Sequence, residues 1–201
     1  MVKVKICGLT RNCDARAAAL LGADYLGAVV CLRSPRHVPV ERLAEVFRGV
    51  SAKRVGVFAD APAELILGAV ASAELEAVQL HGAESAEFIR ELKAHLGAVE
   101  LWVARQPELF TADCPAELLV ADTPKDFQSN QRSCCDWSAA RRLARERKIL
   151  LAGGLDATNL AAAIREVRPY GVDLASGTER APGIKDLDKL NEIFTIIKEY
   201  K

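Results

Sequence analysis

Short apolar runs recur along the whole chain, and segments with helical spacing separate them. Within each run the apolar residues are consecutive, which is typical of strands buried on both faces, as in parallel sheets. The predicted strands cover residues 2–7, 25–30, 54–59, 77–80, 100–104, 118–121, 149–152 and 171–175. Because parallel strands need crossover connections, the segments between them are expected to be helices.

These intervening segments carry helix start and stop signals. Residues 84–96 give the clearest helical pattern, and Gly97 follows as a stop. Asp60 is a plausible N-cap for a helix that has Pro62 in its first turn. The remaining predicted helices cover residues 14–21, 39–47, 62–71, 136–146, 156–167 and 186–200, with only a turn of helix over 106–110.

Eight predicted strands and eight helical segments therefore alternate, at about 25 residues per unit, and no Gly/Ser-rich linker divides the chain. Strict alternation predicts an α/β fold with a parallel sheet and helices outside it. Eight units favour a small, closed (β/α)8 (TIM) barrel formed by one domain over residues 1–201. The alternative is an open doubly wound sheet, but the first strand-to-helix turn lacks a G-x-G-x-x-G pattern.

Charge, hydropathy and cysteine content limit the expected binding partners, cellular location and cysteine chemistry. Lys+Arg and Asp+Glu both number 27, so nothing favours nucleic acid or an anionic membrane as a partner. No stretch of about 18 apolar residues and no signal-peptide layout is present, so a cytoplasmic protein is expected. The six cysteines include no CxxC pair, and we expect free thiols rather than disulfides or a zinc site.

Polar residues gather where the predicted strands end. In strand order they are Cys7, residues 33–37, Asp60, His81, Asp122, residues 153–154 and residues 176–177. The carboxyl ends of the strands carry the active site in barrels of this kind. We therefore expect these residues to share one site.

Two of these strand ends have the small residues of a phosphate site. Gly153-Gly154 precedes a helix, and Ser176-Gly177 follows the last strand. Small residues let backbone N–H groups approach an anion, and barrel enzymes often bind phosphate after strands seven and eight. On the glycines alone, ordinary turns with positive φ explain the sequence equally well.

Cys7 and Asp122 would face each other across the pocket from the first and sixth strands. A thiol can act as a base if nearby positive charge favours its thiolate, and a carboxyl can act as an acid. The pair would suit proton transfer from carbon on one side and to oxygen on the other. Against this, an isolated cysteine is more often a small core residue, and Asp122 could simply cap a helix or turn.

Three further residues have both a functional and a structural interpretation. Arg36 could pair with a substrate carboxylate or be a solvated loop arginine. His81 could donate to the substrate or be a structural histidine. Lys5 lies inside a strand, where its charge needs a partner, and a structural ion pair inside the barrel would supply one.

Matches to one known family run in order from the first strand to the last helix. They are Lys5-Ile6-Cys7-Gly8-Leu9-Thr10, Ser34-Pro35-Arg36, Val55-Gly56-Val57-Phe58, Val78-Gln79-Leu80-His81-Gly82, Asp136-Trp137, Leu151-Ala152-Gly153-Gly154-Leu155, Val172-Asp173 with Ser176-Gly177, and Pro182-Gly183-Ile184-Lys185-Asp186. On these stretches the chain resembles the phosphoribosylanthranilate isomerases of tryptophan biosynthesis. The resemblance implies a (β/α)8 barrel without metal or organic cofactor.

The resemblance also implies a reaction and its residues. The reaction is the Amadori rearrangement of N-(5-phosphoribosyl)anthranilate to 1-(2-carboxyphenylamino)-1-deoxyribulose 5-phosphate. Asp122 resembles the general acid that opens the ribose ring, and Cys7 the general base that removes the C2′ proton. The implied binding residues are Arg36 for the anthranilate carboxylate, Asp173 for substrate hydroxyls, and Gly154, Ser176 and Gly177 for phosphate. The expected partner is a small phosphorylated molecule, and the chain would act as a monomer or homodimer.

One segment departs from the family pattern. Between the acid and Trp137 the family usually has a glycine-rich stretch, which this chain lacks. Asp126 in this segment is a rival to Asp122 as the acid, although only Asp122 directly follows an apolar strand. Side-chain donors that could replace the missing glycines are Gln128, Ser129, Asn130 and Arg132. The alternatives are a related barrel sugar-phosphate isomerase or epimerase, and a non-catalytic barrel that binds a phosphorylated ligand.

Overall fold

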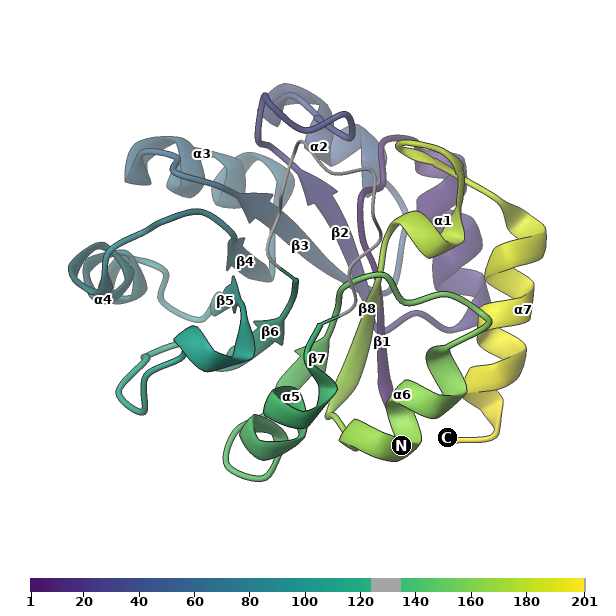
Figure 1. Cartoon of the computed structure of the whole chain (residues 1–201). Coiled ribbons are helices and arrows are strands. Elements are labelled where there is room, and N and C mark those ends of the chain that lie inside the picture. Colours follow the sequence, from purple (N-terminus) through teal and green to yellow (C-terminus); the bar gives the residue numbers. More distant parts are fainter. Residues whose placement is uncertain (124–134, 201) are drawn as a thin grey trace.

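The computed structural model describes residues 1–123 and 135–200. Its centre is a closed barrel of parallel strands in sequence order, in which β1 also pairs with β8 (Figure 1). The strands are β1 (Lys3–Ile6), β2 (Tyr25–Val29), β3 (Lys53–Phe58), β4 (Ala77–Leu80), β5 (Glu100–Arg105), β6 (Leu118–Ala121), β7 (Ile149–Leu151) and β8 (Gly171–Leu174). The predicted (β/α)8 barrel is confirmed, and the open sheet is excluded.

Helices surround the barrel, as Figure 1 shows. They are α1 (Asn12–Leu21), α2 (Val40–Val46), α3 (Ala63–Ala73), α4 (Ala86–His95), α5 (Trp137–Ala144), α6 (Leu160–Val167) and α7 (Leu187–Lys198). The connection after β5 holds only the 3₁₀ turn η1 (Pro107–Leu109), as the sequence indicated. Asp136 and Asp186 cap α5 and α7 by accepting hydrogen bonds from backbone N–H groups of the first turn.

Two helix starts differ from the sequence prediction. Asp60 does not cap α3, because its Oδ1 accepts the Ala83 N–H at 2.7 Å and Pro62 occupies the N-cap position. The helix expected from residue 156 begins at Leu160. In the turn before it, the Leu160 N–H still donates to Asp156 O at 3.0 Å, and local side-chain bonds are added, in which Asn159 Oδ1 accepts the Asp156 N–H and Asp156 Oδ1 accepts the Thr158 N–H. Such bonds compete with the helical ladder.

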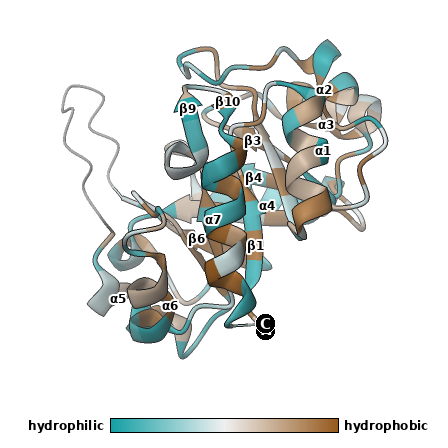
Figure 2. Cartoon of the chain, turned by 90° about the vertical axis from the view of Figure 1, so that its right-hand side faces the viewer, coloured by the Kyte–Doolittle hydropathy of each residue, from teal (hydrophilic) through white to brown (hydrophobic). Residues whose placement is uncertain are grey.

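A short antiparallel hairpin extends the connection after β8. It follows the 3₁₀ turn η2 (Ser176–Thr178) and consists of β9 (Glu179–Ala181) and β10 (Ile184–Lys185). Figure 2 shows the hairpin at one end of the molecule, above α7. Across the described ranges, no helix is long and apolar enough to cross a membrane.

The apolar core has two layers that the barrel wall separates. The outer layer fills the space between the strands and the surrounding helices, with buried residues such as Leu26, Leu101 and Leu119. The inner layer fills the barrel itself, and includes Val55 and Trp102 among its buried members. Alternate residues of each strand face inward, because side chains of a strand point to opposite faces in turn.

The same alternation positions the polar residues at the carboxyl ends of the strands. On β1, Lys5 and Cys7 belong to the inward series, and on β4, Gln79 and His81 do. Asp122 continues the inward series of β6. The apolar inner layer therefore ends below a ring of polar side chains.

Candidate active site

A cavity of about 920 Å³ opens at the carboxyl ends of the strands. Residues from every barrel strand or from the loop that follows it line this cavity, and its walls mix apolar and polar side chains. Seven of the eight residues predicted for the site line it: Cys7, Arg36, His81, Asp122, Gly154, Asp173 and Ser176. The barrel thus brings together residues that lie far apart in the sequence.

Cys7 lies at the end of β1 and is 8% exposed. Space for its sulfur comes from Gly27 of β2, where a Cβ would lie 2.9 Å from Cys7 Sγ and 3.2 Å from Lys5 Nζ. The thiol and the ammonium group therefore approach the same point on β2.

Lys5 is fully buried and forms an ion pair of 2.8 Å with Asp173 Oδ2. Burial opposes its charge, but the Asp173 carboxylate and Cys7 outweigh it and raise the pKa of Lys5 above its ordinary value. This confirms the structural ion pair predicted for Lys5. The other carboxylate oxygen of Asp173 is buried and has no hydrogen-bond partner in the described part of the chain, so it can accept a bond from a ligand.

Asp122 and His81 face each other at the end of β6 and β4. His81 Nε2 lies 3.3 Å from Asp122 Oδ2, and the Thr123 N–H donates to Asp122 Oδ1 at 2.8 Å. The turn after β7 packs directly against this pair, since a Cβ at Gly153 would lie 3.3 Å from Asp122 Oδ1. The carboxyl group is therefore held at the cavity wall, with a titratable ring beside it.

Arg36 reaches the cavity from the connection after β2 and forms a two-pronged ion pair with Glu179 of β9. The Nε–Oε1 distance is 2.8 Å and the Nη2–Oε2 distance is 2.6 Å. Hydrogen bonding to Glu179 raises the pKa of Arg36 despite its partial burial. Burial alone would raise the pKa of Glu179, but Arg36 and Lys185 lower it below its ordinary value.

Lys185 of β10 is buried behind this ion pair. Its Nζ donates to Cys7 O at 2.6 Å and to Ala175 O at 3.0 Å, and lies 3.2 Å from Glu179 Oε1. Burial is the main cause that lowers the pKa of Lys185. One ammonium group thus joins the end of β1, the end of β8 and the hairpin.

A second polar cluster joins the loops after β3 and β4 to the end of β5. Glu84 accepts the backbone N–H groups of Asp60 and Gly82, each at 2.9 Å. The Glu84 carbonyl accepts a bond of 2.7 Å from Arg105, whose side chain also lines the cavity. The rim of the cavity is therefore cross-linked on this side as well.

The two predicted phosphate turns lie against each other. Gly154 has a φ of 63°, and its carbonyl accepts a bond from Asn159 Nδ2 at 3.0 Å. A Cβ at Gly177 would lie only 2.0 Å from Leu155 O, so the turn after β8 can approach the turn after β7 only because residue 177 is glycine. Gly154 and Ser176 line the cavity, whereas Gly177 does not.

Glu179 and the linking role of Lys185 were missed by sequence reasoning. Lys185 belongs to the family match at residues 182–186, but the sequence assigned it no role. Glu179 pairs with Arg36 across a separation of 143 residues, which no local sequence pattern reveals. Asp126 and the proposed substitutes for the missing glycines (Gln128, Ser129, Asn130 and Arg132) lie outside the described residues. Within residues 1–123 and 135–200, no group of three or more His, Cys, Asp or Glu side chains could hold a metal.

A closed barrel with a cavity at the carboxyl ends of its strands, lined in part by polar side chains, is typical of the class of (β/α)8-barrel enzymes. Within that class, residues 4–196 match the family model of N-(5′-phosphoribosyl)anthranilate (PRA) isomerase. The isomerase of Pelobacter propionicus is 40% identical over 203 residues, covering 99% of this chain and 97% of the relative. The isomerase of Gloeothece citriformis is 37% identical over 211 residues, covering 100% of this chain and 96% of the relative.

Solved structures point to the same family as the sequence matches. The phosphoribosyl anthranilate isomerase of Thermus thermophilus has a TM-score of 0.88 and 33% identity, covering 100% of both chains. A second such isomerase, in complex with reduced 1-(o-carboxyphenylamino)-1-deoxyribulose 5-phosphate, has a TM-score of 0.83 and 30% identity, covering 99% of this chain and 100% of the other. The chain belongs to the N-(5′-phosphoribosyl)anthranilate isomerase family, which confirms the resemblance read from the motifs.

Proposed function

We propose that this chain converts N-(5-phosphoribosyl)anthranilate to 1-(2-carboxyphenylamino)-1-deoxyribulose 5-phosphate by an Amadori rearrangement, with Asp122 as general acid and Cys7 as general base. The observation that carries this assignment is that the two side chains line one cavity from β6 and β1, on strands far apart around the barrel. Such an arrangement allows a proton donor and a proton acceptor to act on different atoms of one bound molecule.

The first step is ring opening. Asp122 protonates the ribose ring oxygen, the bond from C1′ to that oxygen breaks, and the nitrogen lone pair forms the Schiff base. His81, 3.3 Å from the carboxyl group, can orient it and exchange a proton with it. The Thr123 N–H fixes the other carboxyl oxygen.

The second step is proton removal from C2′. Cys7, as thiolate, takes this proton while the electron pair moves into the Schiff base, which gives the enolamine. The Lys5 ammonium group approaches the same point on β2 as the Cys7 sulfur, so a cation lies near the base. Tautomerisation then yields the ketone. Because hydrogen moves within one molecule, the reaction consumes no oxidant or reductant and calls for no redox cofactor.

The remaining residues bind the substrate. Arg36 pairs with the anthranilate carboxylate, and the unpartnered Asp173 oxygen accepts a bond from a ribose hydroxyl. Ser176 and the backbone of Gly154 contact the phosphate, and Gly177 allows their two turns to meet. This arrangement supports a small phosphorylated, carboxylated substrate.

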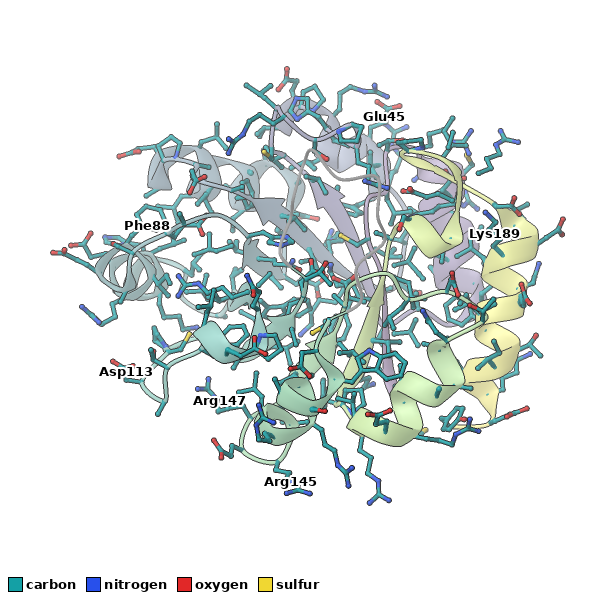
Figure 3. All side chains as sticks on the ribbon, viewed as in Figure 1. Glu45, Phe88, Asp113, Arg145, Arg147 and Lys189 are labelled. Atoms are coloured by element: carbon teal, nitrogen blue, oxygen red, sulfur yellow. The ribbon has the colours of Figure 1, made fainter. Side chains whose placement is uncertain are left out.

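The test is a fluorescence assay with substrate generated in situ. Wild type should consume the fluorescent substrate, and Cys7→Ser and Asp122→Asn should each lower kcat about 10²- to 10⁴-fold, the usual contribution of a general acid or base. The matched controls are Cys13→Ser and Asp113→Asn, at positions outside the cavity (Figure 3 labels Asp113), which should retain full activity.

Three outcomes would contradict the assignment. An inactive wild type that still binds a product analogue would favour a non-catalytic binding protein. Full activity in Asp122→Asn with loss in Asp126→Asn would show that Asp126 is the acid. Turnover of a different sugar phosphate in preference to phosphoribosylanthranilate would favour a related isomerase or epimerase.

A further inference from the structure

The guanidinium group of Arg36 is fixed on one edge by a buried carboxylate. Glu179 binds Nε at 2.8 and 3.1 Å and Nη2 at 2.6 Å. The Glu179 side chain is only 4% exposed. The Arg36 stem lies on the backbone of Gly8, where a Cβ would come within 2.5 Å of Arg36 Cδ. The plane of the guanidinium group is therefore set from two sides.

This ion pair leaves one end of the guanidinium group unused. Glu179 occupies the edge formed by Nε and Nη2, and no acceptor among the described residues bonds Nη1. Arginine presents five N–H donors in a rigid fork, so fixing one edge also fixes the direction of the other donors. Arg36 lines the cavity, and its remaining donors are available to a ligand there.

The charge balance also favours an anionic ligand. A carboxylate beside Arg36 would by itself cancel the arginine's charge. Lys185, buried 3.2 Å from Glu179 Oε1, supplies a second cation without lining the cavity. With all three side chains ionised, the cluster carries one net positive charge, and Arg36 is its only member that lines the cavity.

We propose that Glu179 is a positioning residue that aims Arg36 at the aryl carboxylate of the substrate and thereby sets selectivity for a carboxylated ligand. This inference rests on the proposed function, because that function supplies the carboxylate. Glu179 acts through Arg36 and Lys185 and does not itself touch the substrate.

A purely structural role for Glu179 makes a different prediction. Glu179 Oε1 also accepts the Gly183 N–H, and the Glu179 carbonyl accepts a bond of 2.7 Å from Lys189 of α7, which Figure 3 labels. If Glu179 only holds the hairpin in place, its loss should weaken every ligand equally. A positioning role should weaken only ligands that carry the carboxylate.

The experiment compares two ligands that differ by one group. Calorimetry would measure Kd for reduced 1-(o-carboxyphenylamino)-1-deoxyribulose 5-phosphate and for its phenylamino counterpart without the carboxyl group. We expect wild type to prefer the carboxylated ligand at least about 10-fold, as for a charge-assisted bidentate contact. In Glu179→Gln this preference should fall about 10-fold, while the Kd of the counterpart changes less than about 2-fold.

A matched control is Glu100→Gln, which removes a part-buried carboxylate bonded to Lys53 at the opposite end of the barrel. It should leave the ligand preference unchanged. Glu179→Asp keeps the charge but shortens the side chain, and it should give an intermediate preference. It also provides the test if Glu179→Gln does not fold. In turnover assays, Glu179→Gln should raise KM far more than it lowers kcat.

Equal weakening of both ligands, or an unchanged preference in Glu179→Gln and Glu179→Asp, would overturn the inference. Wild type without any preference for the carboxylated ligand would overturn it as well, together with the proposed substrate. Wild type that shows the preference but no turnover would contradict only the proposed function.

Discussion

The two ends of the barrel interior differ in how completely their polar atoms are satisfied. At the amino ends of the strands, the Tyr25 and Trp102 rings pack edge to face with centroids 4.9 Å apart, and Glu100 accepts the Trp102 indole N–H at 2.9 Å. At the carboxyl ends, the cavity replaces this packing. There, Gln79 Oε1 and Asp173 Oδ1 are buried without a hydrogen-bond partner in the described ranges.

This difference between the two ends indicates that the amino ends mainly contribute stability and the carboxyl ends mainly contribute binding. Buried polar atoms without partners cost free energy, so a fold that keeps them at one end needs close packing elsewhere. The apolar inner layer provides that packing below the cavity. Substitutions at the amino ends should therefore change the free energy of unfolding, and those at the carboxyl ends should change catalysis or binding.

The largest expected effect is on catalysis at the carboxyl ends. Cys7→Ala removes the proposed base, and kcat should fall about 10³- to 10⁴-fold, which corresponds to about 4–5 kcal/mol of barrier. The urea midpoint should stay close to that of wild type, because a small side chain is lost beside an existing cavity. If Cys7→Ala instead lowered the urea midpoint strongly and left kcat intact, the carboxyl end would serve stability rather than catalysis.

At the opposite end, Trp102→Ala should mainly affect stability. Trp102 is fully buried, and removing a buried aromatic side chain costs about 3–5 kcal/mol of unfolding free energy. Denaturant titration measures this loss, and the folded fraction should keep kcat within about 3-fold. If Trp102→Ala lost activity without losing stability, the inner layer would instead shape the cavity directly.

Gly177→Ala should give an intermediate effect on both properties. The added Cβ would lie 2.0 Å from Leu155 O, so the turns after β7 and β8 must separate. We expect a loss of about 1–3 kcal/mol in stability and a rise of about 10-fold in KM. The control is Gly68→Ala in α3, which has open space around it and should stabilise the helix by about 0.5–1 kcal/mol. If KM were unchanged in Gly177→Ala, Gly177 would not contribute to phosphate binding.

The smallest expected effect concerns pH and Glu100. Burial opposes ionisation, but bonds from Lys53 and Trp102 outweigh it and lower the pKa of Glu100 below its ordinary value. The ionised group therefore contributes stability above the unfolded pKa of about 4.3, and this contribution is lost as pH falls through the lower folded pKa.

In practice, Glu100→Gln should lower stability near pH 7 by about 1 kcal/mol or less, as for other half-exposed ion pairs. The difference from wild type should shrink below about pH 4. Thermal unfolding of both proteins between pH 7 and pH 3 measures it. A difference that grows towards low pH would contradict the assigned direction of the pKa shift.

Much of the barrel was predictable from the sequence because its signals are local. β4 and β6 coincide with the predicted ranges 77–80 and 118–121, which are short and mainly apolar and are followed at once by His81 and Asp122. Inward alternation then brings Cys7, His81 and Asp122 to one cavity without any further information.

The rest depended on contacts between distant segments. Asp60 has the composition of a helix cap, yet it bonds the loop after β4. Gly177 suggested an anion contact, but its closest constraint is the Leu155 carbonyl. Glu179 follows a turn in which nothing points to Arg36, and only the closed barrel brings the two together. These positions are decided by packing between loops, which leaves no periodic pattern in the sequence.

Lys185 has a consequence for how this barrel can be altered by exchanging loops. Loops of (β/α)8 barrels usually vary one at a time on a constant frame. Here one ammonium group bonds carbonyls at Cys7 and Ala175 as well as the hairpin, so these segments form one unit. On the other side, Glu84 joins the loops after β3 and β4 to the end of β5 in the same way. Grafting a new specificity onto this frame would require transplanting either unit whole.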